Sequence, residues 1–318
     1  MKRPMSAGAI AWHRCLAAAV LMLPLSASCA QGAPSDATLD EFAAGHGAWS
    51  IDYQHLFMNG DWWDTGPKRP MGSVIVDSMT FRLDYFVAER WDVDVSLPFV
   101  SARYSGAFPH PIETLQVPHP DTVFVDDGNV HGTWADWKAA LRYHANIGGY
   151  YVTPSLTVYV PSHDYTFYGS ATAGQDLKKL GLGIELAHQF ELTDWYYDAH
   201  YEYVFAEQTL GINVDYYAFG FEVGRFLGAA LQLRGFVDAK LGNGWTDTQI
   251  GAHCPPCSDE VWFLHDKFRL EDHINVGAAL DWEFGEHYTF STAVQRMVWG
   301  KSNLNLKYGV DFRLSRSF

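Results

Sequence analysis

The chain lacks long apolar segments and is poor in positive charge. Beyond Ala30 we find no run of about 18 consecutive apolar residues, although 48% of the 318 residues are hydrophobic. The sequence therefore does not encode a bundle of membrane-spanning helices. Lysine and arginine number 22 against 37 aspartates and glutamates, which gives a formal net charge of −15. This balance argues against a nucleic-acid partner, because phosphate binding needs clustered basic side chains.

The one pronounced apolar segment lies at the N-terminus and has the form of an export signal. Positive residues precede the apolar segment Cys15–Leu25, and small residues lead to Ala30, after which we expect cleavage. Cys29 leaves a lipoprotein signal as an alternative, but Ser26 stands where such a signal prefers a larger aliphatic residue. The sequence thus predicts a signal peptide over residues 1–30.

Cysteine is scarce: the chain has four, and two of them leave with the predicted signal. The remaining pair, Cys254 and Cys257, forms the sequence CPPC. In an oxidising compartment this spacing favours a local disulfide. A redox site would need a helix N-terminus at the first cysteine. A zinc site would need further ligands, for which only scattered histidines such as His253 and His265 are near.

Alternation of apolar and polar residues is what the sequence has in abundance. In RWDVDVSLPFV, the apolar side chains from Trp91 to Phe99 alternate with Asp92, Asp94 and Ser96, which is the pattern of a strand with one apolar face. Twelve segments show it: 48–57, 79–87, 91–99, 135–143, 150–160, 180–190, 195–205, 216–223, 229–241, 268–284, 288–298 and 304–318.

The connections between these segments alternate between short and long. Links such as 88–90, 146–149 and 285–287 are short, whereas 59–73, 100–132, 162–179 and 242–267 are long. This arrangement is typical of an all-β fold, an up-and-down antiparallel transmembrane β-barrel with short periplasmic turns and longer extracellular loops. We expect a periplasmic segment over residues 31–46 and the barrel over residues 47–318.

A soluble β-sandwich is the competing fold, and aromatic residues argue against it. On the apolar faces, aromatic residues stand near the strand ends that the short turns join, where a barrel carries its periplasmic aromatic girdle. The chain also ends in Phe318, the terminal aromatic expected of a bacterial outer-membrane barrel and of its recognition by the barrel-assembly machinery. The girdle residues are Trp49, Tyr85, Trp91, Tyr143, Tyr150, Phe190, Trp195, Trp282 and Tyr288.

In a barrel, the polar faces of the strands line the lumen. The acids there are Asp52, Asp84, Asp92, Asp94, Asp136, Glu185, Asp198, Glu202, Glu222, Asp238, Glu271, Asp281, Glu283 and Asp311. The bases are Arg82, Lys138, Arg142, Arg234, Lys240, Arg269, Lys307 and Arg313, and the histidines are His144, His200 and His273. So many ionisable groups require water or close pairing.

Two interpretations of this lumen remain open. The excess of acid predicts a pore that disfavours anions. Alternatively, acids and bases pair across the barrel and fill it. Eight strands are just filled by their side chains and sixteen leave an open channel, so twelve strands favour a narrow, partly obstructed pathway.

Neither catalysis nor metal binding has a convincing pattern. Ser162, His163 and Asp164 follow one another, but neighbours in a strand point to opposite sides, and a catalytic triad requires convergent geometry. Asp126 and Asp127 lack the regular oxygen spacing of a calcium loop. We therefore expect no enzyme, no metal and no cofactor.

Three stretches resemble a known family. They are LPFVSARYSG (Leu97–Gly106), DDGNVHGTWADWKAALRYH (Asp126–His144) and TPSLTVYVPSHDYTFYGSATAGQDLKKLGLGI (Thr153–Ile184). They are similar to the outer-membrane transporters grouped as the "MetA-pathway of phenol degradation" family. The resemblance implies a barrel that moves hydrophobic or aromatic compounds. Ser162, His163, Asp164 and Tyr165 match its motif, as an extracellular gate or as a hydrogen-bonded loop anchor.

The sequence thus predicts an outer-membrane channel that passes a small solute through an acid-rich lumen, surrounded by lipid and lipopolysaccharide. A closed structural or adhesive barrel, and an outer-membrane lipid-modifying enzyme, are the alternatives. Conductance separates the first from the second, and hydrolysis of lipid tests the third.

Overall fold

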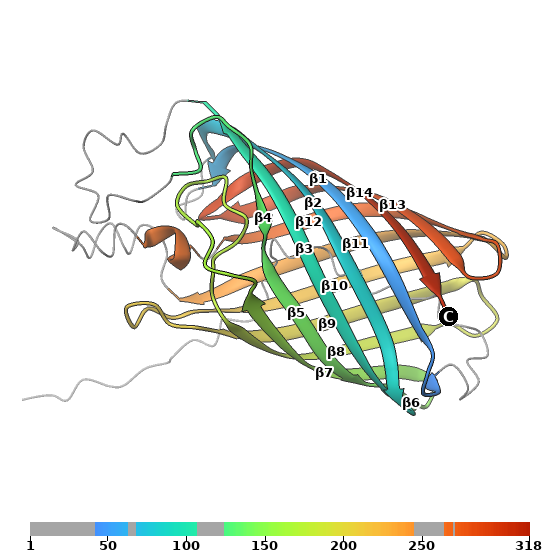
Figure 1. Ribbon diagram of the computed structural model, residues 1–318. Coiled ribbons are helices and arrows are strands. Elements are labelled where there is room, and N and C mark those ends of the chain that lie inside the picture. Colours follow the sequence, from blue (N-terminus) through green and yellow to red (C-terminus); the bar gives the residue numbers. More distant parts are fainter. Residues whose placement is uncertain (1–41, 63–67, 107–123, 245–263, 270) are drawn as a thin grey trace, which may run out of the picture.

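The computed structural model describes residues 42–62, 68–106, 124–244, 264–269 and 271–318. Within these residues the chain forms one closed antiparallel β-barrel with tilted strands (Figure 1). Long connections gather at one end, here called the long-loop end, and tight turns at the other, the short-turn end. The predicted signal peptide, most of the segment after it, and Cys254 and Cys257 lie outside the described residues.

The strands run in sequence order around the barrel. Their bounds are β1 (Gly47–Trp62), β2 (Lys68–Ala88), β3 (Trp91–Ser105), β4 (His131–Trp134), β5 (Asp136–Tyr143), β6 (Ala145–Ile147), β7 (Tyr150–Pro161), β8 (Lys179–Gln189), β9 (Trp195–Ala206), β10 (Val214–Phe226), β11 (Leu231–Gly244), β12 (Asp272–Phe284), β13 (Tyr288–Lys301) and β14 (Asn303–Ser317). A short 3-10 helix, η3 (His265–Phe268), precedes β12.

The first and last strands close the barrel. β1 pairs with β14 in a register that sets Ala48 opposite Ser317 and Asp52 opposite Arg313. Every backbone group that would otherwise lie at a sheet edge can therefore be paired, as a lipid environment requires. The predicted antiparallel barrel is confirmed. The segments β4, β5 and β6 together occupy one position between β3 and β7, so the described residues form twelve barrel strands.

The break between β4 and β5 follows from a proline on the neighbouring strand. Pro98 of β3 accepts a hydrogen bond from Ala135 N at 2.9 Å through its carbonyl, but proline has no N–H to donate in return. The β3 ladder pairs Phe99 with Trp134 and Ser96 with Lys138, which leaves one extra residue on the β4–β5 side. That side therefore bulges at this point.

The outer face of the barrel is apolar and carries aromatic residues at the short-turn end. Large side chains there, such as Leu83 and Trp282, keep 44% and 50% of their surface exposed. Trp91 and Tyr143 face each other across β3 and β5, with ring centroids 4.9 Å apart. A continuous apolar band with an aromatic border is the outer surface of a transmembrane barrel.

Several predicted boundaries were wrong. Much of the predicted link 59–73 is strand. β1 continues to Trp62 and β2 already begins at Lys68, although the alternation of polar and apolar residues does not extend that far. β12 begins at Asp272 rather than at residue 268, since η3 occupies the preceding residues. None of the helices formed by the described residues is long and apolar enough to cross a membrane.

Candidate functional site: the barrel lumen

Three cavities formed by the described residues of the lumen share lining residues. A cavity of about 430 Å³ lies at the short-turn end, where Gly228 and Phe318 line it. A cavity of about 70 Å³, the mid-barrel cavity, shares Asp198 and Arg234 with it. A cavity of about 150 Å³ at the long-loop end shares Asp52 and other residues with the mid-barrel cavity.

The structure places the predicted lumen residues inside the barrel with one exception. They line these cavities or bond to residues that do. Lys307 was assigned to the inner face by alternation, and this is wrong. Its β14 neighbours Tyr308 and Leu306 pair with Phe57 and Met58, so Lys307 is the extra residue of a bulge and is exposed.

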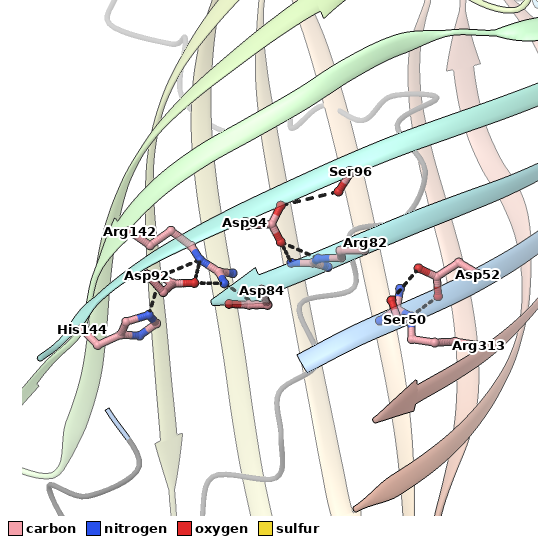
Figure 2. A network of polar contacts seen from close by, with 10 residues as sticks. All are labelled: Ser50, Asp52, Arg82, Asp84, Asp92, Asp94, Ser96, Arg142, His144 and Arg313. Carbon is pink, nitrogen blue, oxygen red and sulfur yellow. Dashed lines mark hydrogen bonds and ion pairs between the residues drawn. The ribbon is translucent and has the colours of Figure 1, made fainter. Parts of the chain in front are cut away.

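One wall of the short-turn cavity carries a network centred on Asp92 (Figure 2). Arg142 Nε donates to both carboxylate oxygens of Asp92, at 2.9 and 3.1 Å, and Arg142 Nη2 contacts Asp84 Oδ2 at 2.5 Å. His144 Nε2 lies 2.9 Å from Asp92 Oδ1. Asp92 and Arg142 stand directly opposite in the β3–β5 register. The side chain of Asp92 is fully buried.

Two further arginines complete this wall. The β2–β3 register sets Asp84 opposite Asp94, an unfavourable pairing of like charges. Arg82 binds Asp94, and Arg142, which also binds Asp92, binds Asp84, so Asp84 and Asp94 are neutralised by different guanidinium groups. On the adjoining strands, Arg313 of β14 binds Asp52 of β1.

The opposite wall repeats this arrangement around Arg234 of β11. Its Nη1 donates to Glu222 Oε2 on β10 at 2.7 Å, and its Nε donates to Asp281 Oδ2 on β12 at 2.8 Å. Tyr196 of β9 donates its hydroxyl to Glu222 Oε1 at 2.9 Å. Each guanidinium thus bridges adjacent strands.

These ion pairs run along the walls rather than across the lumen. Arg82, Arg234 and Arg313 bind carboxylates on adjacent strands, and Arg142 reaches one strand further to Asp84. The pairing therefore neutralises much of the wall charge while the cavities remain between the walls. A network that filled the barrel would have needed pairs between opposite walls.

The alternation rule missed an apolar patch inside the barrel at the long-loop end. Its members are buried inner-face residues of β1, β2, β3, β13 and β14: Leu56, Met58, Val74, Val76, Ala102, Tyr104, Met297, Leu304 and Leu306. Val125 and Ala171, from two connections, pack against them. The signal was present in β1, where Leu56 and Met58 continue the same face as Ser50, Asp52 and Gln54.

The connection after β7 folds inward over this end, and Tyr165 holds it. The Tyr165 side chain is 4% exposed; its hydroxyl donates to Asp136 Oδ1 and accepts from Asp176 N at 2.9 Å. Burial, reinforced by the Asp136 carboxylate, raises the pKa of Tyr165 far above its ordinary value of 10.0. Gly169, Ser170 and residues 172–175 of the same connection line the long-loop cavity.

Ser162 and His163 are in contact, contrary to expectation. Ser162 Oγ lies 2.8 Å from His163 Nδ1, because both residues follow the end of β7 in a bend where strand alternation no longer applies. Ser162 Oγ donates to the carbonyl of Trp134 at 2.8 Å, and His163 Nε2 lies 3.1 Å from Thr133 Oγ1. These contacts tie the connection to β4, as a loop anchor would.

Asp126 and Asp127 are held by the protein itself. Asp126 accepts hydrogen bonds from Ser170 N and Ala171 N at 2.8 to 2.9 Å; burial nevertheless raises its pKa. Asp127 bonds Asn129 and His131, which hold its pKa well below the ordinary value. No group of histidine, cysteine or carboxylate side chains among the described residues has the arrangement of a metal site.

The comparisons found no protein family that matches this sequence and no matching curated protein. Solved structures do resemble it. One is the COG4313 outer membrane channel from Pseudomonas putida F1, with a TM-score of 0.64 and 13% identity over 86% of this chain and 96% of that chain.

Two other barrels are more distant. The β domain of the Bordetella autotransporter BrkA has a TM-score of 0.46 and 14% identity, over 86% of this chain and 99% of that one. The KdgM porin has a TM-score of 0.41 and 9% identity, over 85% and 98%. At the identity of the Pseudomonas channel, the likeness shows the fold: this chain is a twelve-stranded antiparallel barrel of the outer-membrane type.

Proposed function

We propose that this protein is an outer-membrane channel that passes a small solute through its lumen. The observation that carries the proposal is the placement of the ion pairs along the walls, which leaves three adjoining cavities from the short-turn end to the long-loop end. The structural likeness to an outer-membrane channel supports it. The N-terminal signal, the surrounding lipopolysaccharide and assembly through Phe318 belong to the same proposal.

The lining suggests a solute with an apolar part. The long-loop cavity has an apolar side formed by Leu56, Met58, Val76 and Leu304, and a charged side that includes Lys138. A compound with an apolar body and one polar group could contact both sides at once. This agrees with the resemblance to the phenol-degradation transporters. The excess of acid in the lumen further disfavours anions.

Single-channel recording in a planar bilayer tests the proposal. The refolded barrel is expected to give discrete steps, and the reversal potential in a salt gradient is expected to favour cations. A folded barrel without steps would support a closed structural barrel instead. Folding is checked independently by the heat-dependent mobility of the barrel in gel electrophoresis.

An enzyme is the second candidate, favoured only by the contact between Ser162 and His163. However, Ser162 donates its hydroxyl hydrogen to the Trp134 carbonyl, so His163 is not placed to remove it. A serine-directed inhibitor combined with a phospholipid substrate tests this directly. Hydrolysis that the inhibitor abolishes would overturn the proposal that the protein is not an enzyme.

A further inference from the structure

The mid-barrel cavity has a strongly acidic lining. Five acids contribute to it, Asp52, Asp198, Glu222, Asp238 and Asp311, against two arginines, Arg234 and Arg313. The arginines bind Glu222 and Asp52, respectively. Asp311 accepts hydrogen bonds from Gln54 at 2.6 Å and from Gln295 at 3.4 Å.

Asp198 and Asp238 differ from the other acids of this lining. They are only 5% and 9% exposed. In each, Oδ2 is buried and receives no hydrogen bond within the described part of the chain, although the carboxyl group of Asp198 also lies within hydrogen-bonding reach of Glu185. A buried carboxylate oxygen without a partner is costly, and two of them on one cavity indicate a place for a positively charged hydrogen-bond donor.

Two glycines hollow the wall around this cavity. A Cβ at Gly220 would lie 2.0 Å from His200 Cε1, and a Cβ at Gly277 would lie 2.2 Å from Phe236 Cζ. The rings of His200 and Phe236 therefore lie against the wall, and both line the cavity. An aromatic ring beside carboxylates is a favourable surface for an organic cation.

The size and chemistry of the cavity favour an ammonium group. The volume of about 70 Å³ is much smaller than that of the adjoining cavity, which suits a small charged group rather than a whole solute. The described residues offer no cluster suited to a metal ion, whereas an ammonium group supplies three donors that can turn toward separate oxygens. The adjoining cavity of about 430 Å³ has room for the remainder of the molecule.

We propose that the mid-barrel cavity binds the ammonium group of a small organic amine, with Asp198 and Asp238 as the acceptors. The inference deepens the proposed channel function by naming a class of solute. It rests on that function only for the reason why an amine would be bound. Binding itself can be measured without conduction, so the two proposals can fail separately.

Calorimetric titration of the full-length protein, refolded in detergent, with propylammonium chloride tests the proposal. We expect saturable binding at one site, and no such binding of the neutral analogue propan-1-ol. Asp238→Asn should weaken the binding about tenfold or more, because a charge-assisted hydrogen bond is lost. Asp198→Asn provides a second variant if Asp238→Asn does not fold. The matched control is Glu89→Gln, which removes one exposed charge in the turn after β2, outside all three cavities, and should leave binding unchanged.

Three results would overturn the inference. They are the absence of saturable propylammonium binding to the unmodified protein, equal binding of potassium ions, and an equal loss of affinity in Glu89→Gln. Binding that meets the expectation in a barrel without conductance would support this site and contradict the channel.

Discussion

At the scale of single residues, the lumen shows how one arginine can make a buried acid tolerable. Asp92 has no exposed surface, yet Arg142 and His144 give its two oxygens charged or polar partners. Removing one member of such a buried group leaves the rest uncompensated, which costs more than the pair itself contributes. Asp92 is therefore a structural residue of the wall rather than a residue that meets solute.

We expect Asp92→Asn to lower the free energy of unfolding by about 3 kcal/mol, the usual loss when a buried ion pair is broken. Urea titration of the barrel in lipid vesicles, followed by tryptophan fluorescence, measures the change. Glu89→Gln is the control, since Glu89 and Arg90 form an exposed pair at 3.7 Å, and the loss there should stay below about 1 kcal/mol. Equal losses in the two variants would contradict this account of the wall.

The sequence predicted which residues face the lumen well where strands are regular. Asp52, Asp92 and Arg234 lie inside because alternation is unbroken in the part of each strand that holds them. Alternation assigned Lys307 to the wrong face, since a single bulge residue exchanges the two faces of a strand. Leu56 and Met58 were missed for another reason: beyond the polar middle of β1 the inner face itself becomes apolar.

At the scale of strands, glycines on the inner face decide how much space the wall leaves. Gly220 of β10 stands opposite His200 of β9 in the register, and the His200 ring occupies the space that a side chain at position 220 would need. At this point of the wall, a glycine on one strand thus leaves room for a large side chain on the neighbouring strand.

Gly220→Ala should destabilise the barrel by about 1–3 kcal/mol through overpacking, measured by the same urea titration. The additional substitution His200→Ala should recover most of that loss, because it removes the ring that the new methyl group meets. Gly235→Ala is the matched control on β11: its Cβ would meet nothing nearer than 3.9 Å, so it should be neutral or slightly stabilising. Failure of His200→Ala to recover stability would refute the contact.

The connection after β7 behaves as an element of its own, and Tyr165 is its fixing point. Tyr165→Phe removes the bonds to Asp136 and Asp176, which should cost about 1–3 kcal/mol. We expect faster proteolysis of residues 162–178, while the heat-dependent mobility of the barrel is unchanged. His163→Ala should have a smaller effect, because His163 is exposed. Equal protection in Tyr165→Phe and the unmodified protein would argue against an anchor.

The contribution of Tyr165 to keeping the connection after β7 closed also has a defined pH dependence. Its pKa in the folded protein is raised above the ordinary 10.0, so below pH 10 the hydroxyl keeps its proton whether the connection is closed or open, and the hold is complete. Above pH 10 the open form loses the proton and the closed form keeps it, so opening becomes progressively easier. Protection against proteolysis should therefore be constant from about pH 6 to 9 and fall above 10, but only in the protein with Tyr165.

At the scale of the whole molecule, twelve strands produce a lumen that is neither filled nor wide. The barrel could be predicted from sequence because alternation and the lengths of the links are properties of each strand and its neighbours. Whether the ion pairs run along the wall or across the barrel could not be predicted in this way. Whether Arg142 binds Asp92 beside it or an acid across the barrel depends on register and barrel diameter, which alternation does not encode.

The central claim is that the adjoining cavities between the wall-bound ion pairs serve as a path for solute, and single-channel conductance in a planar bilayer tests it most directly. The account predicts discrete steps with a reversal potential that favours cations. A barrel that is demonstrably folded, by its heat-dependent mobility, and yet gives no steps would contradict it.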